Sequence, residues 1–319
     1  MPEEHNTHKQ GAVAAASLRR ELWQRAKRMK LLYLFFLIPL INFFIFRYIP
    51  MYGVTIAFKD YKISKGIIGS EWNNFEHFRD LFKNPFFVRI LRNTLIISLY
   101  RIVFSFPFPI LLALLLNELG KLWFKRLAQS ILYLPHFMSW VVLAGILIEV
   151  LSPQTGVLGH TYNLMGKRAP NLLTSQAAFR PLLIITGIWQ QAGWGTVIYL
   201  AAITSIDPGL YESAAIDGAG RFRMAIHITL PMLAPVITIL FILRLGQILN
   251  AGFDQIFNLY NPLVYEVADI IDTYVFREGI LGRKFDFSTA VGLFKNVIGV
   301  MLIVVTNSII KRSSEYGIW

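Results

Sequence analysis

Three basic residues lie inside long apolar stretches of this sequence and are its first candidates for chemistry. Arg101, Arg244 and Lys295 stand at similar distances from the outer ends of their stretches. At a helical rise of about 1.5 Å per residue, all three lie roughly 10 Å below one membrane surface. Ionisable side chains at such a depth usually face the protein interior or a water-filled cavity. None has an obvious acidic partner within a stretch, so together they suit an anionic ligand.

Amide and indole groups accompany these cations. Further amides follow Arg244 on nearly the same helical face, and Gln190 and Gln191 stand between two tryptophans in another stretch. Amides can bond sugar hydroxyls, and indole rings can stack on sugar rings. The alternative is that Lys295 and Arg101 extend outwards to the membrane surface while the tryptophans pack between helices. The predicted substrate pathway consists of Arg101, Trp189, Gln190, Trp194, Arg244, Gln247, Asn250 and Lys295.

Residues that would let this chain catalyse a reaction are missing. It has no cysteine, and its six histidines do not stand at metal-ligand spacing. An intramembrane glycosyl or acyl transferase, an alternative class, needs paired carboxylates or a His–Asp pair, whereas Glu149 is the lone carboxylate inside a stretch. The fragment Gly166-Lys167-Arg168 lacks the first glycine of a GxxxxGKS/T phosphate loop. We therefore expect no catalytic residue, metal or cofactor in this chain.

Composition assigns the chain to the membrane proteins. Of its 319 residues, 55% are hydrophobic and 16% are charged, whereas a soluble domain carries about 45–50% apolar and roughly 25% charged residues. The net charge of +12 raises the question of nucleic-acid binding, but the basic residues do not form one patch with exposed aromatics. They flank the apolar stretches, where they hold the orientation of a membrane protein. We expect no nucleic-acid partner.

Six stretches are long enough to cross the hydrocarbon core, which is about 30 Å thick. They cover residues 31–49, 94–116, 131–151, 182–203, 232–250 and 289–310. The first lacks a small-residue cleavage site and is expected to be a retained anchor. A basic cluster precedes it, formed by Arg19, Arg20, Arg25, Lys27, Arg28 and Lys30. This cluster predicts a cytoplasmic N-terminal tail (1–30), a six-helix membrane domain (31–310) and a cytoplasmic C-terminal tail (311–319).

The segment 206–231, between the fourth and fifth stretches, carries the signals of a short exposed helix. Asp207 can accept hydrogen bonds from free backbone N–H groups, and Pro208 suits the first helical position. Gly218 can adopt a positive φ and end this helix, and a second short helix is expected from Ala219 towards Pro231. Such a helix-turn-helix would lie across the membrane face. Three interpretations of this segment are open: a docking site for a motor protein, a plain interhelical loop, or the partner site of a membrane sensor or scaffold.

This segment resembles the EAA motif of ATP-binding-cassette importer permeases. The match runs through Glu212, Ala214 and Gly218 and resumes nine residues later as Ile228-x-Leu230-Pro231. The family pattern has alanine where Ser213 stands, and serine is small enough to keep close packing. The resemblance implies that the ATPase-coupling residues are Glu212, Ser213, Ala214, Ala215, Asp217, Gly218, Ile228, Leu230 and Pro231. It also implies an all-α membrane protein with six transmembrane helices and a type I importer (MetI-like) fold.

Residues 133–142 and 259–275 resemble the carbohydrate-uptake (CUT1) permeases that import alginate, aldouronates or pectin fragments. The resemblance implies a non-catalytic, MalF-like subunit of the cytoplasmic (inner) membrane with both termini in the cytoplasm. Its implied partners are a second homologous permease, expected to make a heterodimer, two cytoplasmic ATPase subunits that bind ATP-Mg, and an external solute-binding protein. The expected substrate is an oligosaccharide. The three cations favour an anionic uronate such as alginate, and neutral oligosaccharides are the alternative.

Overall fold

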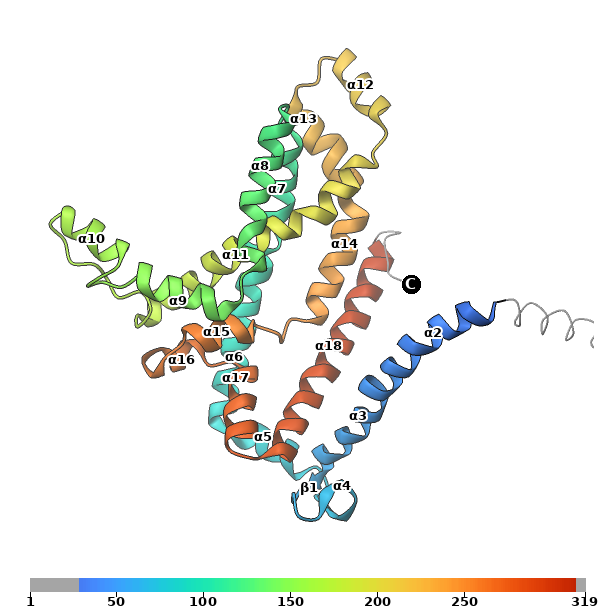
Figure 1. Ribbon diagram of the computed structural model, residues 1–319, viewed down its shortest axis with the longest axis vertical. Helices are drawn as coiled ribbons and strands as arrows, with labels where there is room; N and C mark the ends of the chain where they lie inside the picture. Colours follow the sequence, from blue (N-terminus) through green and yellow to red (C-terminus); the bar gives the residue numbers. More distant parts are fainter. Residues whose placement is uncertain (1–28, 314–319) are drawn as a thin grey trace, which may run out of the picture.

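A computed structural model describes residues 29–313 and is built almost entirely of helices (Figure 1). The predicted tail up to residue 28, with most of its basic cluster, and residues 314–319 lie outside the described residues. Within the described range, four helices are long and apolar enough to cross a membrane, or five if one bent pair counts as a span. The predicted all-α membrane fold is confirmed.

The first span stands apart from most of the molecule (Figure 1). Its pieces are α2 (Lys30–Phe43), η1 (Phe44–Tyr48), α3 (Ile49–Met51) and η2 (Tyr52–Phe58). No side chain of α2, η1 or α3 is buried, and η2 packs against the last helix, α18 (Phe285–Ser313). So large an apolar surface must be covered by lipid or by another subunit.

A small hairpin region follows the first span. It comprises β1 (Lys59–Asp60), α4 (Gly66–Gly69), β2 (Glu71–Trp72) and α5 (Glu76–Lys83), with the two strands antiparallel. The Tyr61 N–H donates to Asp286 Oδ2 at 3.1 Å, which ties this region to the start of α18. The Asn84 side chain accepts from the Phe86 N–H at 2.9 Å and caps the next helix.

The second span is one helix of 33 residues with a π turn inside it. Its pieces are α6 (Pro85–Tyr100), η3 (Arg101–Ser105) and α7 (Pro107–Asn117). Pro107 cannot donate a backbone hydrogen bond, and its ring crowds the carbonyl one turn back. The helix accommodates it with a wide turn in which the Phe106 N–H bonds to the Arg101 carbonyl at 3.0 Å. Arg101 itself is buried there.

The third predicted span, 131–151, is not a single helix. One arm consists of α8 (Leu122–Tyr133) and η4 (Leu134–Phe137), the other of α9 (Trp140–Val150), and they are bent by 101°. The Ser139 hydroxyl accepts from the Val142 N–H at 3.4 Å and starts α9 in a new direction. The prediction of one continuous helix here is therefore wrong, because an N-cap interrupts the apolar run. The short helix α10 (Val157–Leu164) follows.

The fourth span, α11 (Gln176–Thr204), is 29 residues long but is not among the helices with spanning hydropathy. It packs against α7, and its Tyr199 and Leu200 join a buried cluster with Ala113 and Leu233. A helix enclosed by other helices can carry polar side chains that lipid would not tolerate. Together with the bent pair, α11 accounts for the difference from the six predicted stretches.

The region from 206 to 246 differs from expectation in one respect. It contains α12 (Pro208–Ile216), α13 (Arg221–Met224), η5 (Ala225–Thr229) and α14 (Leu230–Gly246). The last three form one span of 26 residues. The expected second short helix is therefore the beginning of the fifth span, because no helix-ending residue separates it from Pro231. Only α12 is separate, and it projects from one end of the molecule (Figure 1).

A packed segment joins the fifth and sixth spans. It consists of α15 (Phe253–Leu259), η6 (Pro262–Val264), α16 (Tyr265–Ala268), α17 (Ile271–Val275) and η7 (Phe276–Leu281). Its apolar side chains share a core with Ile97 of α6 and Phe179 of α11. A second core places Ile271 and Tyr274 of α17 against Val291 of α18. The segment is thus held firmly beside the interior of the bundle.

Candidate functional site: a projecting helix and a cationic cavity

The projecting helix α12 begins and ends where the sequence predicts. Asp207 Oδ1 accepts from the Gly209 N–H at 2.9 Å, and Pro208 takes the first helical position. At the other end Gly218 has a φ of +79°, and the Ala219 N–H bonds to the Ala214 carbonyl at 2.9 Å. These bonds form a left-handed C-terminal cap, for which glycine is the preferred residue.

Most of the surface of α12 is free of the rest of the chain. None of its residues is buried, and Ile216 at its end is 86% exposed. Glu212, Ser213, Ala215 and Asp217 are exposed, while Ala214 is half-buried. The Tyr211 hydroxyl lies 3.0 Å from the Thr229 hydroxyl and links α12 to the base of the fifth span. A short helix held at its base with an open face has the form of a docking element.

The second half of the predicted motif lies at that base. Ile228 is half-buried in the π turn η5, and Leu230 and Pro231 open α14. Leu230 donates its backbone N–H to the Ala225 carbonyl, one residue farther back than in an α-helix. These residues lie in the first part of the span that follows the projecting helix after the turn 217–220.

The three predicted cations line one cavity of about 550 Å³. They come from three different helices and meet polar groups of the segment between the fifth and sixth spans. The lining is formed by Arg101, Gln191, Arg244, Asn250, Gly252, Phe253, Asp272, Val275, Phe276, Ile280 and Lys295. The structure thus brings together four of the eight predicted pathway residues, namely Arg101, Arg244, Asn250 and Lys295.

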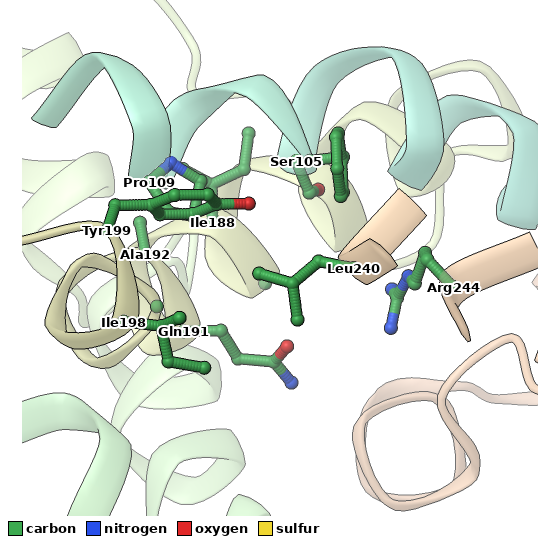
Figure 2. Close-up of a pocket in the computed structure, with 12 residues that line it drawn as sticks. Ser105, Pro109, Ile188, Gln191, Ala192, Ile198, Tyr199, Leu240 and Arg244 are labelled. Carbon is green, nitrogen blue, oxygen red and sulfur yellow. The ribbon is translucent and has the colours of Figure 1, made fainter. Parts of the chain in front are cut away.

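Two further hollows adjoin this cavity. One, of about 240 Å³, lies between α7, α11 and α14 and shares Gln191 and Arg244 with it. Figure 2 shows Arg244 and Gln191 facing the open space beside Leu240 and Tyr199. The other, of about 370 Å³, shares Asn250 and Lys295 and includes Gln247. The polar lining of the central cavity therefore continues into both adjoining hollows.

Arg101 is held inside the bundle and does not extend outwards. It is 7% exposed, and its guanidinium donates to Gln255 Oε1. The amide nitrogen of Gln255 in turn donates to the Leu183 carbonyl and the Thr186 hydroxyl, each at 2.8 Å. Gly252 has a φ of +91° and leaves space for the guanidinium. The sequence analysis missed Gln255 and Gly252, although the turn-prone Ala251-Gly252 was a signal for a break in the chain.

Lys295 has an acidic partner after all. Its ammonium group forms a hydrogen-bonded ion pair with Asp272 Oδ1. Asp272 lies on α17, outside the apolar stretches, so a search confined to those stretches could not find it. Arg244 differs from both other cations, because it makes no side-chain hydrogen bond or ion pair with any residue in the range 29–313. Its charge faces the cavity and the adjoining hollow.

The predicted aromatic members lie elsewhere. The Trp194 ring stacks on His136 with centroids 4.9 Å apart and planes 3° apart, at the bend between α8 and α9. Trp189 is 47% exposed, and Gln190 is buried beside it. None of these three residues lines the cavity, where Gln191 stands instead. On the helix, Gln191 points 100° away from Gln190, so only the three-dimensional packing distinguishes them.

A buried ion pair supports the cavity wall from behind. Arg277 Nη2 contacts Asp269 Oδ2 at 2.6 Å, and the Asp269 side chain is 2% exposed. The Thr273 hydroxyl donates to the same carboxylate at 2.7 Å, and Asn93 donates to the Asp269 carbonyl at 3.1 Å. The hydrogen bond with Asp269 raises the pKa of Arg277. This network fixes the turn before α17 and hence the position of Asp272.

A bundle of apolar helices with a polar cavity inside it and an exposed helix projecting at one end has the form of a transport permease. The chain belongs to the family of inner membrane components of binding-protein-dependent transport systems, whose sequence profile matches residues 105–314. The resemblance found in residues 212–231 is confirmed: this is a MetI-like permease of an ATP-binding-cassette transporter.

Two relatives from Bacillus subtilis (strain 168) are similar over most of their length. The chain is 44% identical over 301 residues to the polygalacturonan/rhamnogalacturonan transport system permease protein YteP, covering 94% of both chains. It is 45% identical over 298 residues to Protein LplB, covering 93% of this chain and 94% of that protein.

Solved structures agree in the arrangement of the helices. A bacterial ABC transporter involved in the import of the acidic polysaccharide alginate contains a chain that matches with a TM-score of 0.84 at 42% identity. The match covers 92% of this chain and 99% of that one. A bacterial alginate ABC transporter in complex with an alginate pentasaccharide-bound periplasmic protein also matches with a TM-score of 0.84 at 42% identity, covering 93% of this chain and 99% of that one.

Proposed function

We propose that this permease carries an acidic oligosaccharide, of the uronate type, across the cytoplasmic membrane. The observation that carries this proposal is the cationic cavity: Arg101, Arg244 and Lys295 surround it, and Asp272 is the one carboxylate among the described residues of its lining. The net charge of this lining attracts an anion, and the amides of Gln191 and Asn250 suit sugar hydroxyls. The relatives support the same class, since YteP is named for polygalacturonan and rhamnogalacturonan transport and the alginate transporter for an acidic polysaccharide.

Neutral oligosaccharides are the second candidate. The ion pair between Asp272 and Lys295 removes one positive charge from the cavity, and Phe253 and Phe276 add apolar ring surface to its wall. Such a wall also suits an uncharged sugar. The excess of two cations over carboxylates in the lining favours the acidic class.

The proposal assigns ATP hydrolysis to partner subunits. Two cytoplasmic ATPases that bind ATP-Mg would contact the permease at α12. The contacting residues would be Glu212, Ser213, Ala214, Ala215, Asp217 and Gly218. Below them, Ile228, Leu230 and Pro231 would connect α12 to the base of the fifth span. This assignment places both termini in the cytoplasm. A second homologous permease would complete the pathway and cover the exposed first span, and an external solute-binding protein would deliver the sugar. No residue of this chain would take part in a covalent step.

The continuous helix from Arg221 to Gly246 supplies the connection between the two sites. It begins beside α12 and carries Arg244 at its far end, about 35 Å away at 1.5 Å per residue. A rigid helix transmits a push at one end to the other. Closure of the ATPase pair would therefore move Arg244 relative to Arg101 and Lys295, and so change the anion site between two arrangements.

The test is ATPase stimulation of the assembled complex in lipid nanodiscs. The complex is supplied with its solute-binding protein and with either an alginate pentasaccharide or maltopentaose, a neutral sugar of equal length. We expect stimulation by the acidic sugar and little by the neutral one. Stimulation by maltopentaose alone contradicts the acidic substrate class but leaves the permease assignment intact.

A further inference from the structure

One acidic side chain, that of Asp272, lines the cationic cavity and pairs with one of its three cations. Asp272 lies on α17, and Lys295 reaches it from α18. The two side chains are 26% and 15% exposed, respectively, and both belong to the cavity lining. A carboxylate at this point has the same chemistry as the uronate group that the cavity is proposed to bind.

The other two cations of the cavity are not neutralised in this way. Arg101 donates to a neutral amide, that of Gln255, and Arg244 has no ion-pair partner among residues 29–313. Asp272 therefore reduces the charge of one cation and leaves the others available. The cavity thus has one site where an incoming carboxylate must exchange with a resident one.

Hydrogen bonds fix the backbone on each side of Asp272, whereas the side chain of Lys295 can change its conformation. The Ile271 N–H donates to the Thr94 hydroxyl at 3.0 Å, and the Thr273 hydroxyl donates to Asp269 at 2.7 Å, both in buried surroundings. These bonds hold the residues on each side of Asp272. Lys295 sits on a flexible four-carbon stem, so its ammonium group can turn from Asp272 to another carboxylate without movement of the backbone.

The ion pair is not needed to hold α17 on α18. Ile271 and Tyr274 of α17 already pack against Val291 in a buried core, and apolar burial of this kind supplies most of the energy of helix contacts. Removing two charges from water offsets much of the attraction in a largely buried pair, so the ion pair adds less than the apolar contacts do. The position of Asp272 in the cavity therefore calls for a role other than that of a structural staple.

Resting on the proposed function, we infer that Asp272 is a specificity-determining residue that acts as a built-in competitor for the substrate carboxylate. It occupies Lys295 when no acidic sugar is present. An oligouronate carboxylate replaces it, and Asp272 replaces the sugar again when the cavity rearranges. Because of this exchange, the acidic sugar binds more weakly than it would to three unpaired cations. Weaker binding allows the sugar to leave the cavity, and transport requires a ligand that can both enter and leave.

The test is the equilibrium dissociation constant of the assembled complex in nanodiscs, without solute-binding protein, for alginate pentasaccharide and for maltopentaose. We expect Asp272→Asn to bind the acidic sugar about tenfold more tightly, because a competing ion pair is removed, and to transport it severalfold more slowly. Binding of maltopentaose should change less than about twofold. Glu278→Gln is the matched control, since it breaks the ion pair with Lys284, at 2.9 Å, outside the cavity.

A second pair of variants separates competition from a structural role. Lys295→Gln leaves Asp272 without its partner and should weaken binding of the acidic sugar. Adding Asp272→Asn to that variant should change binding little, because Lys295, for which Asp272 competes, is already absent. If Asp272→Asn fails to tighten binding when Lys295 is present, or tightens it equally in the Lys295→Gln background, while the unaltered complex prefers alginate, the inference is overturned and the proposed function stands. Preference of the unaltered complex for maltopentaose overturns both.

Discussion

The guanidinium of Arg101 rests against the backbone of Gly252, where the β-carbon of any other residue would collide with its terminal nitrogens. The two residues are far apart in the sequence and belong to a π turn of the second span and to the start of α15. Gly252 also has a φ of +91°, which L side chains rarely adopt. The cavity therefore depends on a glycine for the position of its most buried cation.

Gly252→Ala should displace Arg101 and damage the cavity. We expect a loss of about 1–3 kcal/mol of stability from backbone strain, together with at least tenfold weaker binding of an alginate pentasaccharide. Thermal unfolding and equilibrium binding of the complex measure the two effects. Gly292→Ala on α18 is the control, because its β-carbon would meet open space. Equal behaviour of the two variants would contradict the role of Gly252.

Gly218→Val should leave the complex assembled but uncouple ATP hydrolysis from transport. Gly218 has a φ of +79° with open space around it, so a β-branched residue would strain the cap of α12 without a clash elsewhere. Gly218→Asn should be milder, since asparagine tolerates the left-handed region. Vesicle uptake and ATPase activity are measured side by side. Uptake by Gly218→Val at the level of the unaltered protein would refute the coupling role.

Asp269→Ala should destabilise the permease by about 1–3 kcal/mol, because it leaves the donors of Arg277 and Thr273 without their buried acceptor, while the Arg277 side chain, 33% exposed, keeps some contact with solvent. The carboxylate is 2% exposed and accepts hydrogen bonds from Arg277 and Thr273. The loss is measured by chemical unfolding of the purified protein. Glu71→Gln, which breaks an exposed ion pair with Lys65 at 2.9 Å, should leave the unfolding midpoint unchanged. A similar shift in both variants would disprove the importance of burial.

Substitutions in α11 should distinguish the stack of Trp194 on His136 from the cavity that Gln191 lines. Trp194→Ala removes the stacking on His136 and should cost about 0.5–1.5 kcal/mol in pair energy, with little change in substrate affinity. Gln191→Ala should do the reverse, since Gln191 lines the cavity. Unfolding and sugar-binding measurements on both variants check this pattern. If Trp194→Ala weakens sugar binding more than Gln191→Ala does, Trp194 belongs to the substrate pathway and this prediction is wrong.

The local elements of this protein could be predicted because their signals are local. Asp207, Pro208 and Gly218 determine a short helix through caps and backbone angles, which do not depend on distant contacts. The break at Ser139 was missed because its N-cap signal lies inside an apolar run that reads as one span. The sequence predicts a separate second coupling helix because Pro231 reads as a helix end, whereas the wide π turn η5 just before it accommodates the proline inside a continuous span.

The sequence by itself determined the membrane class, the projecting helix with its EAA-like motif, and the presence of three cations at one depth. These follow from hydropathy, capping and helical rise, which are properties of short segments. Only the tertiary structure decided which polar residues share a cavity: it brought in Gln191 and Asp272 and placed Trp189, Gln190 and Trp194 outside. The reason is physical, because neighbours on a helix diverge by 100° per residue and the partners of Arg101 and Lys295 come from a segment whose packing is set by contacts across the whole chain.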